Sequence, residues 1–532
     1  MTLQRATQLR HSRLSIALLL VLLAALVGCT GLPPRPPIPQ SYAISDGATT
    51  VLGRVAASSV GTAYDSGFQF MPVGATALET RLALAAQAQR TLDVQTFAFH
   101  DDRVGKEVAQ ALKTAASRGV RVRLLIDDLN TAGTDALLLG LDEHPNTEVR
   151  LFNPFVFGRS SLASRLVQSF ADLRRVNHRM HNKLFIADNA IAIFGGRNIG
   201  DDYFMLAGTV NFVDFDVLCA GRVVRELSTT FDDYWNSEYA YPLTSIVKVA
   251  PTTAQPEESQ PGAFSSAYQS STEKSMSYAD VPPRLEKYTN APSQLAAGRL
   301  RLVGADAEVK ADLTDKIAGT RLEDPKGTVR AYIGDLMHVA KREIFVVSPY
   351  YVPGKDSMQW MRKLSAQGVK MTLLTNSLAA TDEPLVHGGY LRYRKDMLRL
   401  GVEIYELSPT LARRSQSLAH FGESLGRLHA KVVVVDRNQL FVGSMNLDAR
   451  SERFNTELSM LMKGPALAND FLDLLAFEAS AYRVRLNLQT DEVEWVSGSA
   501  SDEKVLTSEP EASAWLRFKV LLFGAIVPEG WL

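Results

Sequence analysis

The chain has 532 residues, of which 46% are hydrophobic and 22% are charged, and its formal net charge at pH 7 is -1. This composition excludes a wholly disordered chain and provides enough apolar material for more than one packed domain. Nucleic-acid-binding domains usually carry a strongly basic surface, so this balance of charge gives no reason to expect nucleic acid as a partner.

The N-terminus is predicted to be an export signal. Several cationic residues precede an apolar run of about fourteen residues, Leu14 to Val27, which is too short to cross a bilayer easily. Small residues before Cys29 resemble a bacterial lipoprotein signal, with residues 1–28 as signal peptide and Cys29 as the lipidated residue. An uncleaved membrane anchor is the alternative. Because Thr30 rather than an aspartate follows, the resemblance favours the outer membrane of a Gram-negative-type cell, with the protein facing the periplasm.

Residues 29–65 are predicted to form a proline-rich tether, since five prolines between residues 33 and 39 favour an extended and stiff chain. The only other cysteine, Cys219, lies in an apolar stretch and is expected in the core. With Cys29 acylated, the chain would have no internal disulfide.

The chain contains the same local pattern twice. Residues 90–128 and 342–377 each read as an apolar β-rich run, a segment of helical periodicity, a glycine and a second apolar run. The glycines, Gly119 and Gly368, stand where a helix would end in a left-handed conformation. Each copy is expected to be a strand–helix–strand unit with parallel strands.

The repeat predicts two homologous α/β domains. We place these domains at residues 66–250 and 301–485. Residues 251–300, rich in Ser, Pro, Gln and Glu, are predicted to be a linker or an insertion. The C-terminal arm, residues 486–532, carries Trp515 and Trp531 and either docks on the second domain or lies in a membrane surface.

Each half also contains one pattern of chemically active residues. The pattern is a histidine, any residue, a lysine, four residues and an aspartate: His181, Lys183 and Asp188 in the first half, and His429, Lys431 and Asp436 in the second. Small residues and an asparagine follow, with 17 residues from His to Asn in both halves. These are Gly196 and Asn198 in the first half, and Ser444 and Asn446 in the second.

The spacing of this pattern suits a phosphate ligand. Side chains two residues apart on a strand project from the same face, so the His and Lys of each motif are expected to point to one site. An imidazole can act as a nucleophile, and a lysine supplies a fixed positive charge. Small residues near the asparagine would let a phosphate approach the backbone. The aspartates follow a predicted strand, where a turn-forming role is as consistent as a chemical one.

The two motifs resemble those of the phospholipase D superfamily, in which two such motifs from two half-domains form one active site. Within that superfamily, the strings GGRNIGDDYF and GSMNLDARS are most similar to bacterial cardiolipin synthases. The resemblance implies two homologous α/β domains, each a mixed sheet flanked by helices, packed with pseudo-two-fold symmetry around one active site.

The resemblance also implies roles for single residues. His181 would be the nucleophile that forms a phosphohistidine, and His429 the general acid and then base. Lysine and asparagine side chains would hold the phosphate oxygens, and no cofactor or metal ion is implied. Asp216 and Glu457 would each orient one of the two histidines.

The implied function is a phosphatidyltransferase acting on membrane phospholipids, which would make cardiolipin from phosphatidylglycerol and either phosphatidylethanolamine or a second phosphatidylglycerol. Hydrolysis by a phospholipase D or another phosphodiesterase, including a nuclease, stays open because the same chemistry serves these reactions. Two complete motifs disfavour a binding protein with an inactive site.

Replacement of Cys29 by serine tests the predicted anchor. Metabolic labelling with a fatty acid is expected to mark the wild-type chain and to leave Cys29→Ser unlabelled, because acylation needs the thiol. An unlabelled wild-type chain would contradict the lipoprotein prediction.

Overall fold

The fold is known from a computed structural model, which describes residues 32–155, 158, 159, 161, 163–165, 173–248, 281–318, 327–415, 417–419, 421, 424–498 and 502–526. The predicted signal peptide, Cys29 and Trp531 lie outside these residues, as do residues 249–280, which make up most of the predicted linker. No helix among the described residues is both long and apolar enough to span a bilayer.

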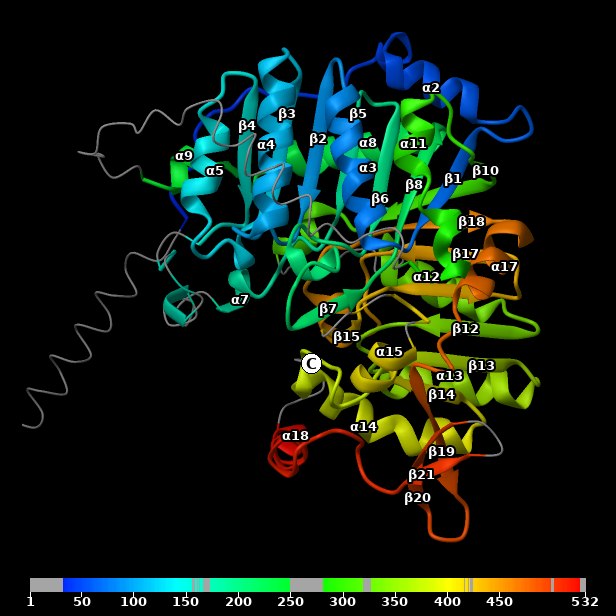
Figure 1. The fold of residues 1–532 in the computed structure, drawn as a ribbon. Helices are drawn as coiled ribbons and strands as arrows, with labels where there is room; N and C mark the ends of the chain where they lie inside the picture. The colour runs from blue at the N-terminus through cyan, green and yellow to red at the C-terminus, as the bar shows by residue number, and fades with distance from the viewer. Residues whose placement is uncertain are drawn as a thin grey trace, which may run out of the picture.

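The first half is built on a nine-stranded sheet (Figure 1). Its order is β10 (Val303–Gly304), β1 (Ser66–Met71), β8 (Asp216–Gly221), β6 (Ile191–Gly195), β5 (Leu184–Ala187), β2 (Thr91–Thr96), β3 (Arg121–Asp127), β4 (Thr147–Phe152) and β9 (Ala240–Pro242).

The second half repeats this arrangement in a ten-stranded sheet. Its order is β11 (Asp306–Ala311), β18 (Leu458–Lys463), β17 (Gln439–Gly443), β16 (Val432–Val435), β12 (Glu343–Val347), β13 (Lys370–Asn376), β14 (Glu403–Leu407), β19 (Ala481–Asn487), β20 (Glu492–Ser497) and β21 (Lys504–Leu506). In both sheets the three strands around the predicted repeat are parallel and their neighbours are antiparallel. The predicted pair of mixed α/β sheets is therefore confirmed.

Helices flank both sheets. The first half carries α2 (Val51–Ser59), α3 (Gly74–Gln87), α4 (Arg103–Ser117), α5 (Asp135–Asp142), α7 (Leu173–Val176), α8 (Arg222–Asn236) and α9 (Leu243–Ile246), with short η1 (Gly47–Thr49), η2 (Asp128–Asn130) and η3 (Asp201–Tyr203). Then follow η6 (Pro283–Tyr288), α11 (Ala291–Ala296), η7 (Thr314–Ala318), α12 (Val329–His338), α13 (Gly354–Ala366), α14 (Pro384–Arg399), α15 (Pro409–Ser415), α16 (Ala449–Arg453), α17 (Pro465–Leu474) and α18 (Ala514–Ile526).

The predicted strand–helix–strand units are β2–α4–β3 and β12–α13–β13. Helix α4 buries Val104, Val108 and Leu112 on one face, as the periodicity predicts. Gly119 and Gly368 follow the ends of α4 and α13 with φ of 92° and 77°, a backbone conformation that glycine adopts without steric cost.

The two halves pack through a shared apolar core. Side chains from both sheets belong to one buried cluster, in which the rings of Phe215 and Phe471 meet edge to face at 5.1 Å. A small parallel pair, β7 (Val210–Val213) with β15 (Leu425–Leu428), joins the halves through the backbone. Figure 1 shows the two sheets stacked one above the other with this pair at their junction.

Three of the predicted domain limits need correction, because strand pairing and burial set them and composition does not. Strand β10 pairs with β1, so residues 303 and 304 belong to the first sheet although they follow the predicted boundary. The limit at residue 485 falls inside β19, and the second sheet continues to Leu506. The predicted tether is packed on the first half, since Arg35 Nε donates to the Ala240 carbonyl at 2.9 Å and α2 buries Leu52.

The aspartate of each motif holds a turn and does not face a cavity. Asp188 and Asp436 have φ of 53° and 52° at the turns after β5 and β16. The Asp188 carboxylate accepts the backbone N–H groups of Gln89, Arg90 and Thr91 at 2.8–3.1 Å, which fixes the start of β2.

Asp436 does the same for β12, through the N–H groups of residues 341–343. Both aspartates were predicted among the catalytic residues. Their contacts correct that prediction and assign the structural role.

Asp188→Ala is expected to destabilise the fold by on the order of 3 kcal/mol, because it leaves three backbone donors without their carboxylate. Asp436→Ala should cost less, since its carboxylate is nearer to solvent. Burial alone would raise the pKa of Asp436, but the backbone donors and Arg342 more than compensate and lower it.

Since the folded-state pKa is lowered, the Asp436 contribution is present above the unfolded pKa and is lost as the pH falls. Thermal unfolding of both variants between pH 3 and pH 7 measures this. Unchanged stability combined with lost activity would contradict the structural role and indicate that the aspartates take part in the reaction.

Candidate active site

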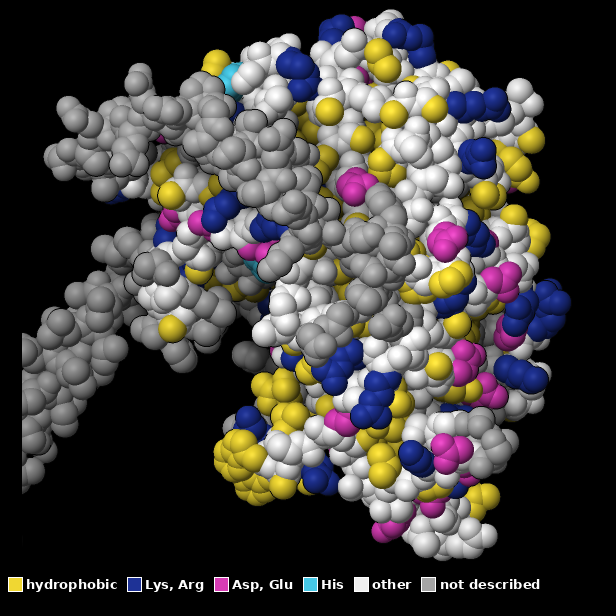
Figure 2. Space-filling view, viewed as in Figure 1, with side chains coloured by type: hydrophobic (Ala, Val, Ile, Leu, Met, Phe, Trp, Pro, Cys, Tyr) yellow, Lys and Arg dark blue, Asp and Glu magenta, His cyan; other side chains and the backbone are white. Residues whose placement is uncertain are grey.

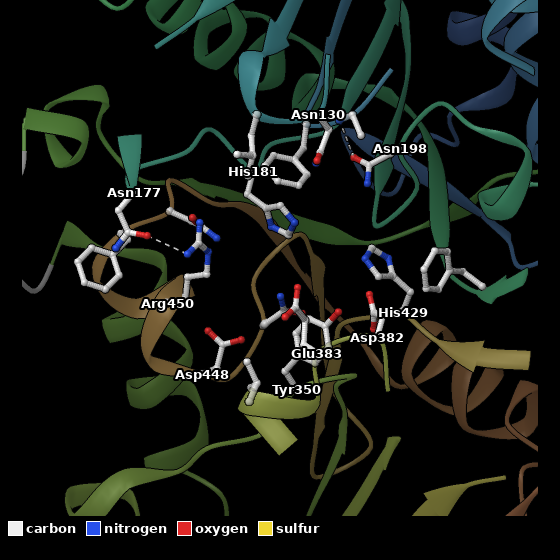
Figure 3. A pocket seen from close by; sticks show the side chains of 18 of the residues that line it. Asn130, Asn177, His181, Asn198, Tyr350, Asp382, Glu383, His429, Asp448 and Arg450 are labelled. Atoms are coloured by element: carbon white, nitrogen blue, oxygen red, sulfur yellow. Dashed lines mark hydrogen bonds between the residues drawn. The ribbon is translucent and has the colours of Figure 1, made fainter. Parts of the chain in front are cut away.

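A cavity of about 880 Å³ lies where the two halves meet. His181 and His429 both line it, and Figure 3 shows them entering from opposite halves with their rings directed into the same space. The other lining side chains with polar or aromatic groups are Phe97, His100, Asn130, Phe155, Asn177, His178, Asn198, Asp202, Tyr203, Phe212, Tyr350, Asp382, Glu383, Asn446, Asp448, Arg450, Phe454 and Asn455.

His181 is held by the second half. Its Nδ1 lies 2.9 Å from Glu457 Oε2, and its backbone N–H donates to the Thr456 carbonyl at 2.9 Å. The Phe97 ring packs edge-on against the imidazole at 4.9 Å. With Nδ1 engaged by the carboxylate, Nε2 is the nitrogen that remains for a ligand in the cavity.

His429 is held in the same way by the first half. Its Nδ1 lies 2.6 Å from Asp214 Oδ2, and its backbone N–H donates to the Val213 carbonyl at 2.8 Å. Tyr203 and Phe212 pack against this imidazole at 5.2 and 5.0 Å. Each histidine therefore depends on a carboxylate from the opposite half.

The structure confirms the predicted contact of Glu457 with a motif histidine but corrects Asp216. Asp216 Oδ2 pairs with Arg81 at 2.8 Å and Arg197 at 3.3 Å, inside the first half. The sheet register explains the error: Asp216 lies opposite Gly195, and Ser459 lies opposite Gly443. The residue equivalent to Glu457 is therefore two positions earlier, at Asp214, which the sequence analysis missed.

The small residues after each motif make room for these carboxylates. A Cβ on Gly196 would lie 2.0 Å from Asp214 Oδ1, so only glycine leaves space for the aspartate. In the second half the hydroxyl of Ser444 donates to Glu457 Oε2. The prediction that small side chains let a phosphate approach the backbone is corrected, because the space beside Gly196 is filled by a carboxylate.

The two motif lysines are not among the residues that line the cavity. Both are nearly fully buried, and the ammonium of each donates to the backbone carbonyl of its own motif histidine, Lys183 at 2.7 Å. Burial and the neighbouring Lys431 lower the pKa of Lys183 to about 7, and burial lowers the pKa of Lys431 to about 8. Both ammonium groups therefore lose a proton more easily than an exposed lysine does.

Burial is also the largest influence on the histidines. It lowers the pKa of His181 to about 4, with Lys183 acting in the same direction and Glu457 opposing. The pKa of His429 is lowered by burial and by Lys431, against the charge of Asp214. Both rings are therefore neutral at pH 7, and each donates Nδ1–H to its carboxylate.

The remaining predicted support residues are the asparagines. Asn198 and Asn446 both line the cavity. Asn198 Oδ1 accepts the Ala98 N–H at 3.3 Å, whereas Asn446 Oδ1 is buried with no hydrogen-bond partner within the described ranges. An amide with an unused polar atom can turn toward a bound ligand.

Charged residues that the sequence analysis did not identify complete the wall. Asp382, Glu383 and Asp448 line the side formed by the second half, together with Arg450, whose Nη1 donates to Asn177 at 2.9 Å (Figure 3). Burial raises the pKa of Asp448 to about 7. In the described part of the chain, no group of three or more His, Cys, Asp or Glu side chains is arranged to hold a metal ion.

The tautomer of His429 tests the assignment of Asp214. Asp214→Asn is expected to remove the acceptor that fixes the proton on Nδ1 and to lower the pKa of His429 further, because a negative charge is lost. Asp216→Asn is the matched control and should leave both properties unchanged while lowering stability. Nitrogen-15 NMR of labelled histidines measures tautomer and pKa, and an equal response to both variants would contradict the assignment.

Comparison with known proteins agrees with this geometry. The family described as cardiolipin synthase, PLD-like domain, matches residues 82–235 and 333–476, one match in each half. The chain is 37% identical over 465 residues to cardiolipin synthase C of Escherichia coli (strain K12), covering 86% of this chain and 94% of that protein. It is also 32% identical over 523 residues to an uncharacterized protein of Helicobacter pylori (strain ATCC 700392 / 26695), covering 94% and 97%.

A solved structure shares the fold. The phosphatidylserine synthase of Haemophilus influenzae Rd KW20 superposes with a TM-score of 0.55 at 12% sequence identity, covering 90% of this chain and 97% of that one. The family match, the identity to a cardiolipin synthase and the two motifs at one cavity agree. The chain belongs to the phospholipase D superfamily, in the family of cardiolipin synthase PLD-like domains, and is a phosphotransferase of the phospholipase D type.

Proposed function

We propose that this protein transfers a phosphatidyl group between membrane phospholipids through a phosphohistidine, and that cardiolipin is its product. The proposal rests mainly on one observation: two imidazoles from opposite halves face one cavity, each with Nδ1 bound to a carboxylate. This arrangement leaves two Nε2 atoms for one phosphorus atom between them.

In the first step, His181 Nε2 attacks the phosphorus of a phosphodiester. A P–N bond forms, and the bond from phosphorus to the headgroup oxygen breaks. The negative charge of the bound phosphodiester raises the pKa of His429, so the ring takes up a proton from solvent at Nε2. His429 then gives this proton to the headgroup oxygen, and the headgroup leaves as an alcohol. Glu457 stabilises the positive charge that develops on the His181 ring.

In the second step, the hydroxyl of the acceptor lipid gives its proton to His429 and attacks the same phosphorus. The P–N bond breaks, His181 is released, and His429 is protonated again for the next cycle. Asp214 stabilises this charged form of His429. The two steps balance, because one alcohol leaves and another takes its place.

The lysines and asparagines supply the electrostatic support. The negative phosphate favours the charged forms of Lys183 and Lys431, whose pKa values burial has lowered. Hydrogen bonds from these cations and from Asn198 and Asn446 would stabilise the non-bridging oxygens as charge builds on them. In this scheme the protein and the two alcohols supply every charge and proton, and neither a cofactor nor a metal ion is required.

The proposed lipids are phosphatidylglycerol as acceptor, and phosphatidylethanolamine or a second phosphatidylglycerol as donor. The similarity to cardiolipin synthase C supports this choice. Nucleic acid fits the site poorly, because Asp382 and Glu383 would repel a long polyanion along the wall of the second half. We further propose that lipidated Cys29 anchors the protein to the outer membrane, facing the periplasm.

Product identification tests the proposed function. The purified protein is incubated with phosphatidylglycerol vesicles, with and without phosphatidylethanolamine, and the lipid products are identified by mass spectrometry. Cardiolipin is expected in both cases. His181→Ala and His429→Ala should each reduce its formation by at least about 10³-fold, because a nucleophile or proton carrier is removed.

A folded control separates chemistry from stability. His387→Ala changes a buried histidine of α14 that does not line the cavity, and it should retain cardiolipin formation. Phosphatidic acid as the only product would indicate hydrolysis, and cleavage of DNA without any lipid product would indicate a nuclease. Either result would contradict the proposal.

A further inference from the structure

Helix α18 exposes an apolar face. Four large apolar side chains on it are strongly exposed: Trp515 (64%), Phe518 (52%), Leu521 (68%) and Leu522 (44%). The Trp515 and Phe518 rings stack at 5.6 Å, so they form one continuous surface. Figure 2 shows this cluster as a yellow knob over α18, at the lower left of the molecule.

The opposite face of α18 is firmly docked. Val520 is buried against Leu378 and Leu391. Gly524 meets Gly388 of α14 closely, since a Cβ on Gly388 would lie 3.3 Å from the Gly524 Cα. The helix is therefore a fixed part of the second half, and the described residues leave its other side exposed.

The polar residues of α18 are all cationic. The helix from Ala514 to Ile526 contains Arg517 and Lys519 and no aspartate or glutamate. Lys519 Nζ lies 5.8 Å from the centre of the Trp515 ring, so the positive charge stands beside the aromatic surface. Aromatic rings flanked by cations match the interface of a bilayer that carries anionic lipids.

Helix α18 lies close to the wall of the cavity. It packs on α14, and the residues at the start of α14 belong to the cavity wall: Glu383, Leu385 and Val386. Leu385 is itself 42% exposed, at the edge between the cavity and the surface. A membrane bound at α18 would therefore lie near one side of the cavity, where acyl chains would have to enter.

We propose that α18 is a membrane-docking helix, which inserts Trp515, Phe518, Leu521 and Leu522 into the surface of an anionic phospholipid bilayer and presents the cavity to it. The role of this docking in catalysis rests on the proposed function. The contact itself is measured separately from catalysis, so that failure of the one can be told from failure of the other.

Fluorescence measures the contact. The full-length protein is mixed with vesicles of phosphatidylglycerol and phosphatidylethanolamine whose acyl chains carry bromine, a contact quencher. Tryptophan emission is expected to fall. In a Trp531→Phe background, Trp515→Phe should lose most of that fall, because Trp235, Trp360 and Trp495 are buried. The N-terminus is the same in every variant, so lipidation affects all of them equally.

Activity on two forms of substrate tests whether membrane docking by α18 serves catalysis. Phe518→Ser with Leu521→Ser should lower product formation from vesicles by about tenfold or more. This is the order expected when two large apolar side chains can no longer be buried in the bilayer. On short-chain phosphatidylglycerol below its critical micelle concentration, the same variant should stay within about twofold of wild type, since no interface is involved. Leu488→Ser is the control, because Leu488 is 85% exposed on the β19–β20 turn and should change neither activity.

Several results would overturn the inference. One is the absence of quenching by brominated lipid, and another is an equal loss of activity on vesicles and on monomeric substrate. A Trp515 emission that changes with protein concentration, without lipid, would indicate a second copy of the chain on this face. Quenching that follows the prediction while no variant turns over lipid would retain the docking helix and reject the proposed function.

Discussion

The whole site depends on one interaction, repeated twice: a buried imidazole bound through Nδ1 to a carboxylate from the other half of the molecule. Neither half contains a complete pair, since His181 relies on Glu457 and His429 on Asp214. All four side chains are at least nine-tenths buried. A buried carboxylate without a partner destabilises the fold. Each carboxylate finds its histidine only when the two halves are docked, so the same contact orients the imidazoles and stabilises the packing of the halves.

Backbone hydrogen bonds also join each histidine to the opposite half. Each histidine donates its main-chain N–H to the carbonyl of the residue directly before the carboxylate that holds its ring. Strands β7 and β15 and the shared aromatic core hold the halves so that these bonds form. The symmetry is incomplete, because Asp214 fits beside Gly196 whereas the longer Glu457 is bound by Ser444. This difference gives the two imidazoles unlike surroundings, as distinct roles in one reaction require.

The sequence predicted the fold well, because duplication leaves two independent traces of each element. The glycines at the ends of α4 and α13, the two motifs and the pair of mixed sheets all follow from local patterns. Contacts between the halves left weaker traces. Asp214 and Asp216 are two residues apart with similar apolar neighbours, and only the register of β6 with β8 shows which one reaches a histidine. Likewise, the acidic wall at Asp382 and Glu383 comes from a loop whose position no local periodicity predicts.

The most direct test of the central claim is the number and position of covalent adducts. The protein is mixed with phospholipid, the reaction is stopped within milliseconds, and the histidines are mapped by mass spectrometry under conditions that preserve P–N bonds. One adduct per chain at His181 is predicted, and it should disappear in His181→Ala. Adducts formed independently at both His181 and His429 would contradict a single site shared by the two halves, and no adduct on either ring during turnover would contradict the phosphohistidine.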